Sequence, residues 1–501
     1  MRTIKYSFLI IMVLFTVSCN NLFEDLDVRN ENQPNIADLY TPKEFYALLV
    51  NGYNTWYNGA IAASPSIAFN NADLFACGTP GWGSGPLWFK PRQSLFNDQH
   101  PDPVIVINFG AWYNFYSGIG TAIKLSKILD DPDYEVILGG VDYSRRAKAH
   151  VYIIQALLYG NIALLYDKAY LFTEEHDAIG FDFIANTKSY QEVMAFAIQR
   201  LDEAIAIIES DPVNEDFSPI IPGFVFNKEN LLQFANSMAA RFLVSNARTP
   251  QENTATDWTR VKAYAEKGLK TDFNILYEQG WRGKVMTRDV GANYLALYNW
   301  GWIRGNQWLI NKMAPNDPAA VYPWPEGVEL LGQITNYEDA RLVKYFSWDE
   351  NSTLWFGWSR VGRPGYGYFI RCEYRYWRYY DVINAEQGYV GHYLKAENDL
   401  YLAESLIRLG QPGAATLINN TRVTVGEMPP ATDADADLLD KMFYERYVES
   451  DLVWGHLGYF DKRRQGLLLP GTAYHFPIPA PELLRNGQPI YTFGGAPGSE
   501  M

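Results

Sequence analysis

Residues 189–208 read S-Y-Q-E-V-M-A-F-A-I-Q-R-L-D-E-A-I-A-I-I, and this stretch indicates how most of the chain folds. Ser189 and Glu192 have the spacing of a capping box, in which each side chain bonds the backbone N–H of the other residue. The apolar residues that follow recur every three or four positions, while Arg200 and Asp202 lie on the opposite side. The pattern predicts an amphipathic α-helix that packs along one face.

The same signals recur along the chain. Thr41-Pro42-Lys43-Glu44 offers an N-cap, a proline at the first helical position and an acid at the third, so a helix is predicted to start there. In chain order the predicted helices form pairs joined by loops, which predicts stacked helical hairpins, although no residue-level repeat consensus is present. Helical periodicity also covers about 106–129, 144–171, 228–248, 257–270, 393–409 and 438–455.

Residues 271–391 have a different character, because their aromatic residues are interleaved with Gly, Pro, Asn and Arg and lack helical spacing. That composition predicts loops and short strands. Residues 70–96 form a second turn-rich, aromatic stretch. Long irregular insertions of this kind are usually functional. Nine of the fifteen tryptophans lie in the first region: Trp281, Trp300, Trp302, Trp308, Trp324, Trp348, Trp355, Trp358 and Trp377.

Charge and cysteine content narrow the class of protein. The 501 residues include 42 basic and 57 acidic side chains, a formal net charge of −15. Nucleic-acid binding rests on basic residues that neutralise phosphates, so the excess of acidic over basic residues argues against a nucleic-acid-binding protein. The same excess argues against membrane binding through a cluster of basic residues. Cys77 and Cys372 could pair if the protein is exported, but spacing alone cannot establish a disulfide.

The N-terminus carries an export signal. Residues 1–18 combine a basic start with an apolar run too short to span a bilayer, which predicts a signal peptide. The run ends in F-T-V-S-C, which resembles the lipobox where bacterial prolipoproteins are acylated, here on Cys19. The alternative is an ordinary signal peptide with an incidental cysteine. Residues 19–40 are polar and acidic and are expected to form a tether. Asn20 and the following acidic cluster favour an outer-membrane, outward-facing location.

Four segments with distinctive motifs follow one another near the C-terminus. Residues 393–410 and 414–426 contain an Ala-Glu helix, a glycine and an Asn-x-x-Arg helix. Residues 445–464 contain Glu-Arg-x-x-Glu and Phe-Asp-x-Arg-Arg, and residues 467–487 contain Pro-Ile-Pro. Together with the lipobox, this set resembles the SusD/RagB family of surface nutrient-binding lipoproteins. Ser450, where an apolar residue is usual, departs from the family pattern.

The resemblance implies a mostly α fold, with tetratricopeptide-like helical hairpins and an irregular aromatic-rich insert. It implies a helical-hairpin region over 41–270 with an aromatic loop at about 70–100, a ligand-binding insert over 271–391, and a C-terminal helical hairpin and signature region over 392–501. It also implies a partner, a SusC-type TonB-dependent transporter on which the protein would sit as a lid. Within the signature, Glu445 and Glu449 are expected to be architectural and to pair with Arg446, Arg463 or Arg464.

A sugar ring has apolar C–H faces edged by hydroxyls, so a glycan binder needs flat aromatic surfaces with polar groups beside them. Residues 281–308 supply both kinds, and Trp300 and Trp302 would lie on one face of an extended segment. Most of the rings are nevertheless expected to be core of the insert. The residues predicted to bind ligand are Asp73, Trp82, Trp88, Trp281, Trp300, Trp302 and Trp308.

An enzyme is the less favoured class. A glycosidase needs two carboxylates on either side of the scissile bond. Among 57 acidic residues some pair will have a suitable spacing, so the acids alone do not indicate an enzyme. No nucleophile-elbow, zinc-protease or phosphate-loop motif occurs, and the six histidines form no pair with metal-ligand spacing. We therefore predict a binding protein without catalytic residues, metal or cofactor. A peptide or other nutrient as ligand, and less favourably a glycoside hydrolase, remain the alternatives.

Overall fold

The protein is described by a computed structural model, in which helices dominate and the strands are short. The described residues are 40–62, 75–77, 103–215, 217, 220–277, 303–322, 332–348, 371–385, 387–451, 453, 455–495 and 497–501. The predicted ligand residues Asp73, Trp82, Trp88, Trp281, Trp300 and Trp302, and the predicted lipidation site Cys19, lie outside them.

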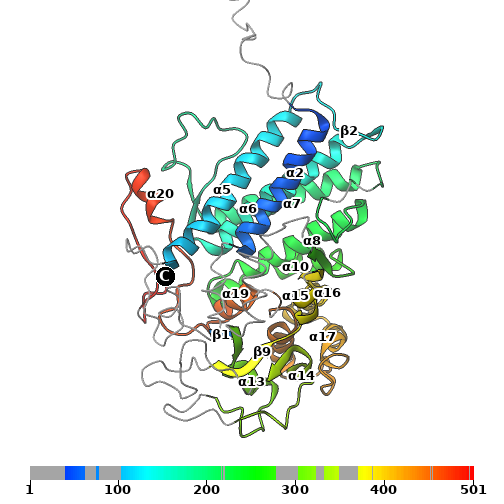
Figure 1. The fold of residues 1–501 in the computed structure, drawn as a ribbon, viewed down its shortest axis with the longest axis vertical. Coiled ribbons are helices and arrows are strands. Elements are labelled where there is room, and N and C mark those ends of the chain that lie inside the picture. The colour runs from blue at the N-terminus through cyan, green and yellow to red at the C-terminus, as the bar shows by residue number, and fades with distance from the viewer. Residues whose placement is uncertain are drawn as a thin grey trace, which may run out of the picture.

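Four long helices form the N-terminal half of the stack. They are α2 (Pro42–Tyr57), α5 (Pro103–Leu129), α6 (Ser144–Leu165) and α7 (Tyr190–Ser210). α2 packs on α5, α5 on α6, and α6 on α7 (Figure 1). Each helix therefore buries its apolar stripe against its neighbours in the sequence, as expected for stacked hairpins.

The stack continues through five shorter helices, which are α8 (Lys228–Ser245), α10 (Trp258–Glu266), α16 (Lys395–Arg408), α17 (Ala414–Arg422) and α18 (Leu438–Glu445). α8 packs on α7 and α10, α16 packs on α10 and α17, and α17 on α18. Although more than a hundred residues separate α10 from α16, the two are neighbours in the stack. The mostly α architecture of helical hairpins predicted from the sequence is thus confirmed.

Both predicted capping boxes are present. The backbone N–H of Thr41 donates to the Glu44 carboxylate (2.8 Å), and the N–H of Glu44 donates to the Thr41 hydroxyl (3.3 Å). Ser189 and Glu192 make the same exchange at the start of α7, at 2.9 and 3.3 Å. These local signals place the helix starts because capping depends only on residues three positions apart.

Two predicted helices end early. The helix predicted over 144–171 ends at Leu165, because the following backbone bonds the C-terminal segment: the N–H of Asp167 donates to the carbonyl of Phe476 (2.9 Å). The helix predicted over 438–455 changes at Glu445 into a π-helix, η3 (Arg446–Ser450). The N–H of Asp451 then bonds the carbonyl of Arg446, five residues back (2.8 Å).

A four-stranded antiparallel sheet forms the irregular end of the molecule. Its order is β1 (Phe75–Cys77), β7 (Ile303–Asn306), β9 (Arg371–Tyr376) and β8 (Phe346–Trp348). Cys77 lies in β1 and Cys372 in β9, and β7 runs between these two strands.

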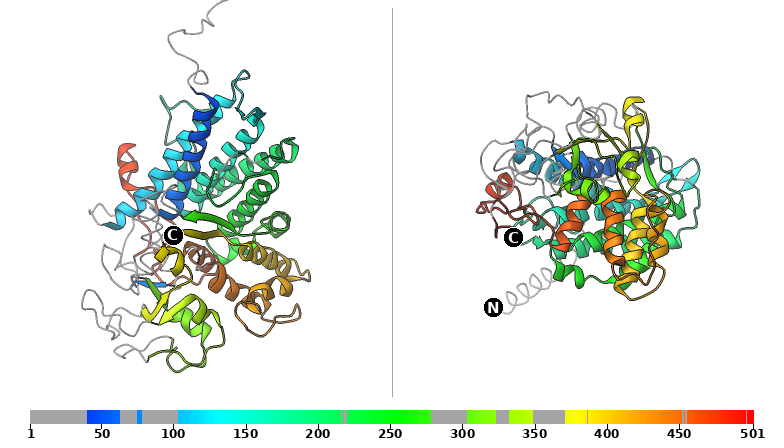
Figure 2. Two further views of the ribbon diagram at one scale, coloured as in Figure 1. Left: turned by 45° about the vertical axis from the view of Figure 1, so that its right-hand side comes forward. Right: turned by 90° about the horizontal axis from the view of Figure 1, so that it is seen from below.

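The remaining elements are short. The segment 271–391, predicted to consist of loops and short strands, also contains short helices, α13 to α15. Figure 2 shows that this part stays at the opposite end of the long axis from the start of α2. The remaining elements are η2 (Asn58–Ala62), β2 (Ile137–Leu138), β3 (Val141–Asp142), β4 (Lys168–Tyr170), β5 (Thr187–Ser189), α9 (Pro250–Thr254), β6 (Phe273–Tyr277), α13 (Gln307–Met313), α14 (Arg341–Tyr345), α15 (Tyr380–Ala385), β10 (Gly388–Tyr393), α19 (Gly455–Gln465) and α20 (Ala480–Arg485).

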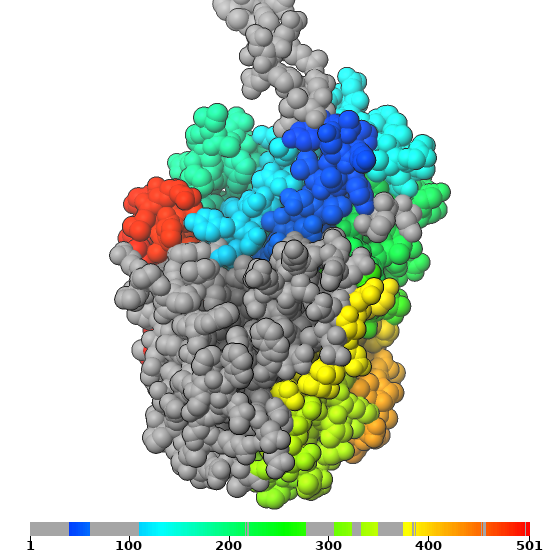
Figure 3. All heavy atoms as spheres, viewed as in Figure 1, coloured from blue at the N-terminus to red at the C-terminus, as the bar shows by residue number. Residues whose placement is uncertain are grey.

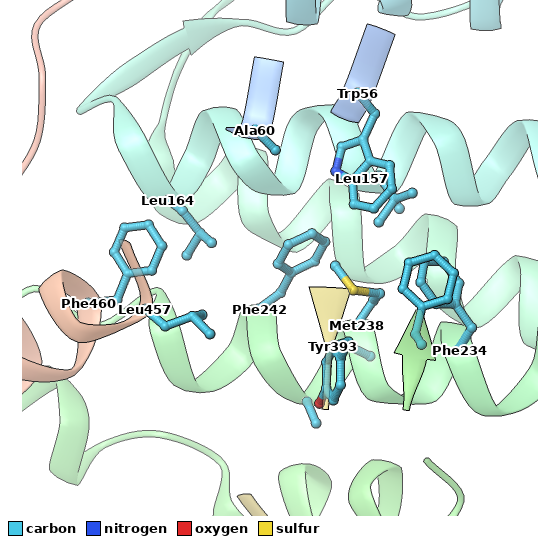
Figure 4. Packing of buried hydrophobic residues seen from close by; sticks show 14 of the residues in the cluster. Trp56, Ala60, Leu157, Leu164, Phe234, Met238, Phe242, Tyr393, Leu457 and Phe460 are labelled. Carbon is cyan, nitrogen blue, oxygen red and sulfur yellow. The ribbon is translucent and has the colours of Figure 1, made fainter. Parts of the chain in front are cut away.

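The main core lies between the helices and takes side chains from both halves of the described chain. Figure 4 shows Trp56 of α2 above Leu157 of α6, with Met238 of α8 below them, and Leu457 of α19 below Leu164 of α6. α6 is buried on almost all sides, so its apolar residues do not form a narrow stripe. Gly160 permits the close crossing of α6 and α8, because a Cβ there would lie 2.3 Å from the ring of Phe242.

Candidate functional site

Among the predicted ligand residues, Trp308 is the one that the described part of the chain contains. It begins the first turn of α13, where its N–H donates to the side-chain oxygen of Asn306 (2.8 Å). The ring is half-buried. The ammonium of buried Lys462 lies 3.6 Å from the ring centroid, and the ring of Tyr447 meets it edge-on at 5.3 Å. Trp308 therefore joins the insert to α19 and η3.

A second aromatic group lies where β9 ends and α15 begins. Trp377 and Tyr380 stack in parallel, with ring centroids 3.7 Å apart and planes 11° apart. The guanidinium of Arg375 lies 4.9 Å from the centroid of Trp377. All three side chains are half-buried, so flat apolar surface and a hydrogen-bond donor meet at the protein surface. The sequence analysis did not select this pair, although their i,i+3 spacing at a turn-rich position was a signal.

Glu449 of η3 holds the segments around this aromatic pair. Its carboxylate accepts hydrogen bonds from the hydroxyl of Tyr345 (2.8 Å) and from Nη2 of Arg378 (2.6 Å), and its carbonyl accepts one from Nη1 of Arg378 (2.9 Å). The carbonyl of Tyr345 in turn accepts from the N–H of Trp377 (2.7 Å). Burial alone would lower the pKa of Arg378, but the Glu449 carboxylate, together with the neighbouring tyrosines, outweighs burial and holds that pKa well above its ordinary value.

A fully buried arginine fixes the other side of the insert. Arg341 of α14 forms two hydrogen bonds to the carboxylate of Glu445, at 2.6 and 3.1 Å, and others to Asp339. The hydroxyl of Thr421 donates to the same Glu445 carboxylate (2.7 Å). Opposite charges this close keep a buried guanidinium ionised. The pKa of Arg341, which burial alone would lower, is therefore raised by Glu445 and Asp339.

The signature glutamates thus have architectural contacts, but the expected partners were wrong. Glu445 pairs with Arg341 and Glu449 with Arg378, both in the insert, and not with Arg446, Arg463 or Arg464. Arg422 of the Asn-x-x-Arg motif adds a longer ion pair to Glu445, at 3.7 Å. Those three arginines bond other groups instead. Arg446 pairs with Asp461, Arg464 pairs with Glu404 and Asp461, and Arg463 donates to the carbonyls of Leu164, Ser245 and Tyr474.

Two further observations bear on the kind of site. No cluster of His, Cys, Asp and Glu side chains that could hold a metal ion occurs within the described ranges. In the same ranges, the helices include none that is long and apolar enough to cross a membrane.

This architecture, helical hairpins with a small sheet carried by an insert, is the SusD-like fold, as comparison with solved structures confirms. A SusD superfamily protein from Bacteroides thetaiotaomicron matches with a TM-score of 0.57 at 10% identity, over 86% of this chain and 92% of that chain. Surface glycan-binding protein A from the same species, in complex with laminarihexaose, matches with a TM-score of 0.54 at 14% identity, over 90% and 99%.

A SusD-like carbohydrate-binding protein from Bacteroides fragilis matches with a TM-score of 0.53 at 14% identity, over 87% of this chain and 88% of that chain. No protein-family model matches the sequence. No curated protein matches it either. At these identities the likeness establishes the fold, and the function has to be argued from the site.

Proposed function

We propose that the protein is a cell-surface lipoprotein that binds an oligosaccharide or polysaccharide and delivers it to a SusC-type TonB-dependent transporter without cleaving it. The single observation that carries the proposal is the half-exposed Trp377–Tyr380 stack with Arg375 beside it. In this proposal a lipid on Cys19 holds the protein at the outer membrane, facing outward.

The chemistry of the group suits a neutral sugar. Stacked aromatic rings present a rigid apolar surface, and they lose little conformational entropy when a ligand binds. A guanidinium is a planar donor of several hydrogen bonds, which suits the hydroxyls at the edge of a sugar. The buried Glu449 pairs fix the flanking residues, so the rings are held in place before the ligand arrives.

Two further facts support this proposal. A protein with the same fold carries laminarihexaose, so a β-glucan such as laminarin is the first ligand to test. In addition, the seven predicted ligand residues belong to the same two aromatic-rich stretches that supply β1, β7 and β9 to the sheet.

Affinity electrophoresis through gels that contain a single polysaccharide tests the binding claim. We expect at least one polysaccharide, laminarin first, to retard the wild-type protein. The variant Trp377→Ala with Tyr380→Ala should lose most of that retardation. Tyr113→Ala is the control, because Tyr113 is a partly exposed tyrosine of α5 whose charged neighbours, Glu482 and Arg485, belong to α20 and not to the insert. Equal retardation of the wild type and the double variant would remove this aromatic pair from the ligand site.

Incubation of pure protein with the retarding polysaccharide separates binding from hydrolysis. We expect reversible retention and no new reducing ends. Steady product release would instead favour a glycoside hydrolase. Retention of peptides with no retention of any polysaccharide would move the ligand to the peptide class and would contradict the glycan proposal.

A further inference from the structure

The loop 171–186, between β4 and β5, exposes apolar side chains at its tip. Ile179 is 96% exposed, Ile184 63% and Phe183 40%. Gly180, with φ +82°, provides the left-handed turn directly after Ile179. Scattered single apolar residues are ordinary on a surface, but three within six residues of one loop form a local patch.

The loop is held rigidly by a ladder of aromatic rings. Phe181 packs edge-on against Phe172 (4.9 Å between centroids), His176 (5.2 Å) and Phe183 (5.0 Å). Phe183 in turn packs edge-on against Tyr170 of β4, at 5.1 Å. The base of the loop is therefore ordered by its own side chains, while the tip remains exposed.

Hydrogen bonds fix the backbone on both sides of the tip. The carboxylate of Asp182 accepts from the N–H groups of Ile184 and Ala185, both at 3.0 Å. On the other side, the ammonium of Lys127 on α5 donates to the carbonyl of His176 (3.2 Å). Because this loop is already ordered, it loses little conformational entropy when a partner binds. Its exposed apolar residues are thus preorganised for contact.

The position of the loop separates it from the insert. Figure 1 places the loop at the same end of the long axis as the start of α2, whereas β1, β9, α13 and α14 lie at the other end. Figure 3 shows it as a lobe next to α20. A partner that contacts the loop leaves the insert free for ligand. The described chain begins at Tyr40, at this same end of the long axis.

The charge around the tip selects the kind of partner. Glu175, Asp177 and Asp182 are all exposed around it, and Lys127 of α5 pairs with Asp177 (3.7 Å), so the tip keeps an excess of negative charge. An anionic lipid surface would repel these carboxylates, which disfavours the bilayer itself as the partner. A protein with an apolar hollow rimmed by Lys and Arg would complement both the tip and its charges.

From these observations we infer that the tip of the 171–186 loop, Ile179, Phe183 and Ile184, is the contact through which the protein docks on its membrane-embedded transporter. The inference rests on the proposed function, because that function supplies the transporter. The inference adds to that function which surface of this protein contacts the transporter, and it predicts an apolar, basic-rimmed surface on the transporter. Three apolar side chains at the centre of a contact, ringed by charges, have the anatomy of an interface hot spot.

The test uses the full-length, tagged protein, extracted from membranes of its own host in mild detergent. The large β-barrel protein that co-purifies is identified by mass spectrometry and quantified per bait molecule. The variant Ile179→Asp with Ile184→Asp should capture at least about tenfold less of that barrel. Val225→Asp with Val343→Asp is the matched control, since these valines are 49% and 53% exposed and lie outside the loop. The control should capture a wild-type amount.

The possible outcomes separate the two claims. If the wild type captures a barrel and the loop variant captures as much, the loop inference is wrong and the transporter proposal stands. If the wild type captures no barrel, the transporter proposal fails and takes the inference with it. A photo-crosslinking residue at Ile179 gives a second readout that does not depend on the folding of the double variant. Crosslinks from position 179 to the barrel, and none from position 343, are expected; the reverse pattern overturns the inference.

Discussion

Arg341 and Glu445, 104 positions apart in the chain, form a two-point ion pair in which both side chains are fully buried. The pair joins α14 of the insert to the end of α18, so the insert is fixed to the helical stack by charge as well as by apolar packing. Glu449, one turn further on, makes the equivalent connection to Arg378 beside the aromatic pair. The geometry of the proposed ligand surface therefore depends on residues that never touch a ligand.

Arg341→Met should destabilise the protein strongly. The change leaves the carboxylates of Glu445 and Asp339 buried without their cation, which typically costs about 3–5 kcal/mol. Lys344→Met, in the same short helix, breaks the exposed pair with Glu427 and should cost about 1 kcal/mol or less. Urea unfolding followed by tryptophan fluorescence measures both, and similar costs for the two variants would contradict the structural role of Arg341.

Gly160→Ala should destabilise the crossing of α6 and α8. The new methyl group would meet the ring of Phe242 at 2.3 Å, and overpacking of this kind costs about 1–3 kcal/mol. Gly120→Ala in α5 is the matched control, because nothing lies within 4 Å of its Cβ position. There the higher helix propensity of alanine should stabilise by up to about 1 kcal/mol. Thermal unfolding should shift in opposite directions for the two variants, and a shared direction would refute the packing argument.

Trp308→Ala should lower the stability of the protein but should leave its ligand binding nearly unchanged. The ring is half-buried against Tyr447 and carries the Lys462 ammonium over its face, so its loss should cost about 2–3 kcal/mol. Polysaccharide retention at a temperature where the variant is folded should remain close to wild type. If the variant is stable but no longer retained by the polysaccharide, Trp308 contacts the ligand, as the sequence analysis predicted.

Acid should weaken the fold partly through His475. Burial, assisted by the nearby cations Arg248, Arg463 and Lys168, lowers the pKa of this imidazole from 6.5 to about 2. Below pH 6.5 the unfolded chain therefore binds a proton that the native protein does not, so stability falls as the pH falls, by about 1.4 kcal/mol per pH unit. Burial also lowers the pKa of His150, so that histidine acts in the same direction.

Urea unfolding between pH 7.5 and pH 5 measures this dependence. His475→Gln should reduce the slope below pH 6.5 by one proton, while His176→Gln, in the exposed loop, is the comparison variant. An unchanged slope in His475→Gln would show that His475 accepts a proton in the native protein.

In this protein the sequence predicts local structure, such as helix starts, better than it predicts contacts between residues far apart in the chain. The capping residues Thr41 and Ser189 mark the helix starts correctly, because the interactions lie within one turn of chain. The π turn at Arg446–Ser450 was not predicted, since apolar periodicity does not distinguish one turn of π-helix from regular α-helix. The fold class followed from the helix patterns and the signature motifs together.

The candidate site could be predicted only in outline. Aromatic enrichment pointed to the insert, and Trp377 was counted within it, but its i,i+3 spacing from Tyr380 does not by itself distinguish a stacked surface pair from core rings. The partner of Glu445 could not be predicted either. Arg341 lies 104 positions away, and several arginines closer in sequence offered the same charge. Which arginine pairs with Glu445 depends on how the insert packs against the helical stack, and the spacing of residues in the sequence does not show that packing.

A glycan array probed with the wild-type protein and with Trp377→Ala plus Tyr380→Ala tests the central claim most directly. We predict that the wild type binds a discrete set of oligosaccharides, with β-glucans tested first, and that the double variant, while still folded, loses at least about tenfold in affinity. Binding to no glycan on the array by a folded wild-type protein that retains peptides would contradict the claim.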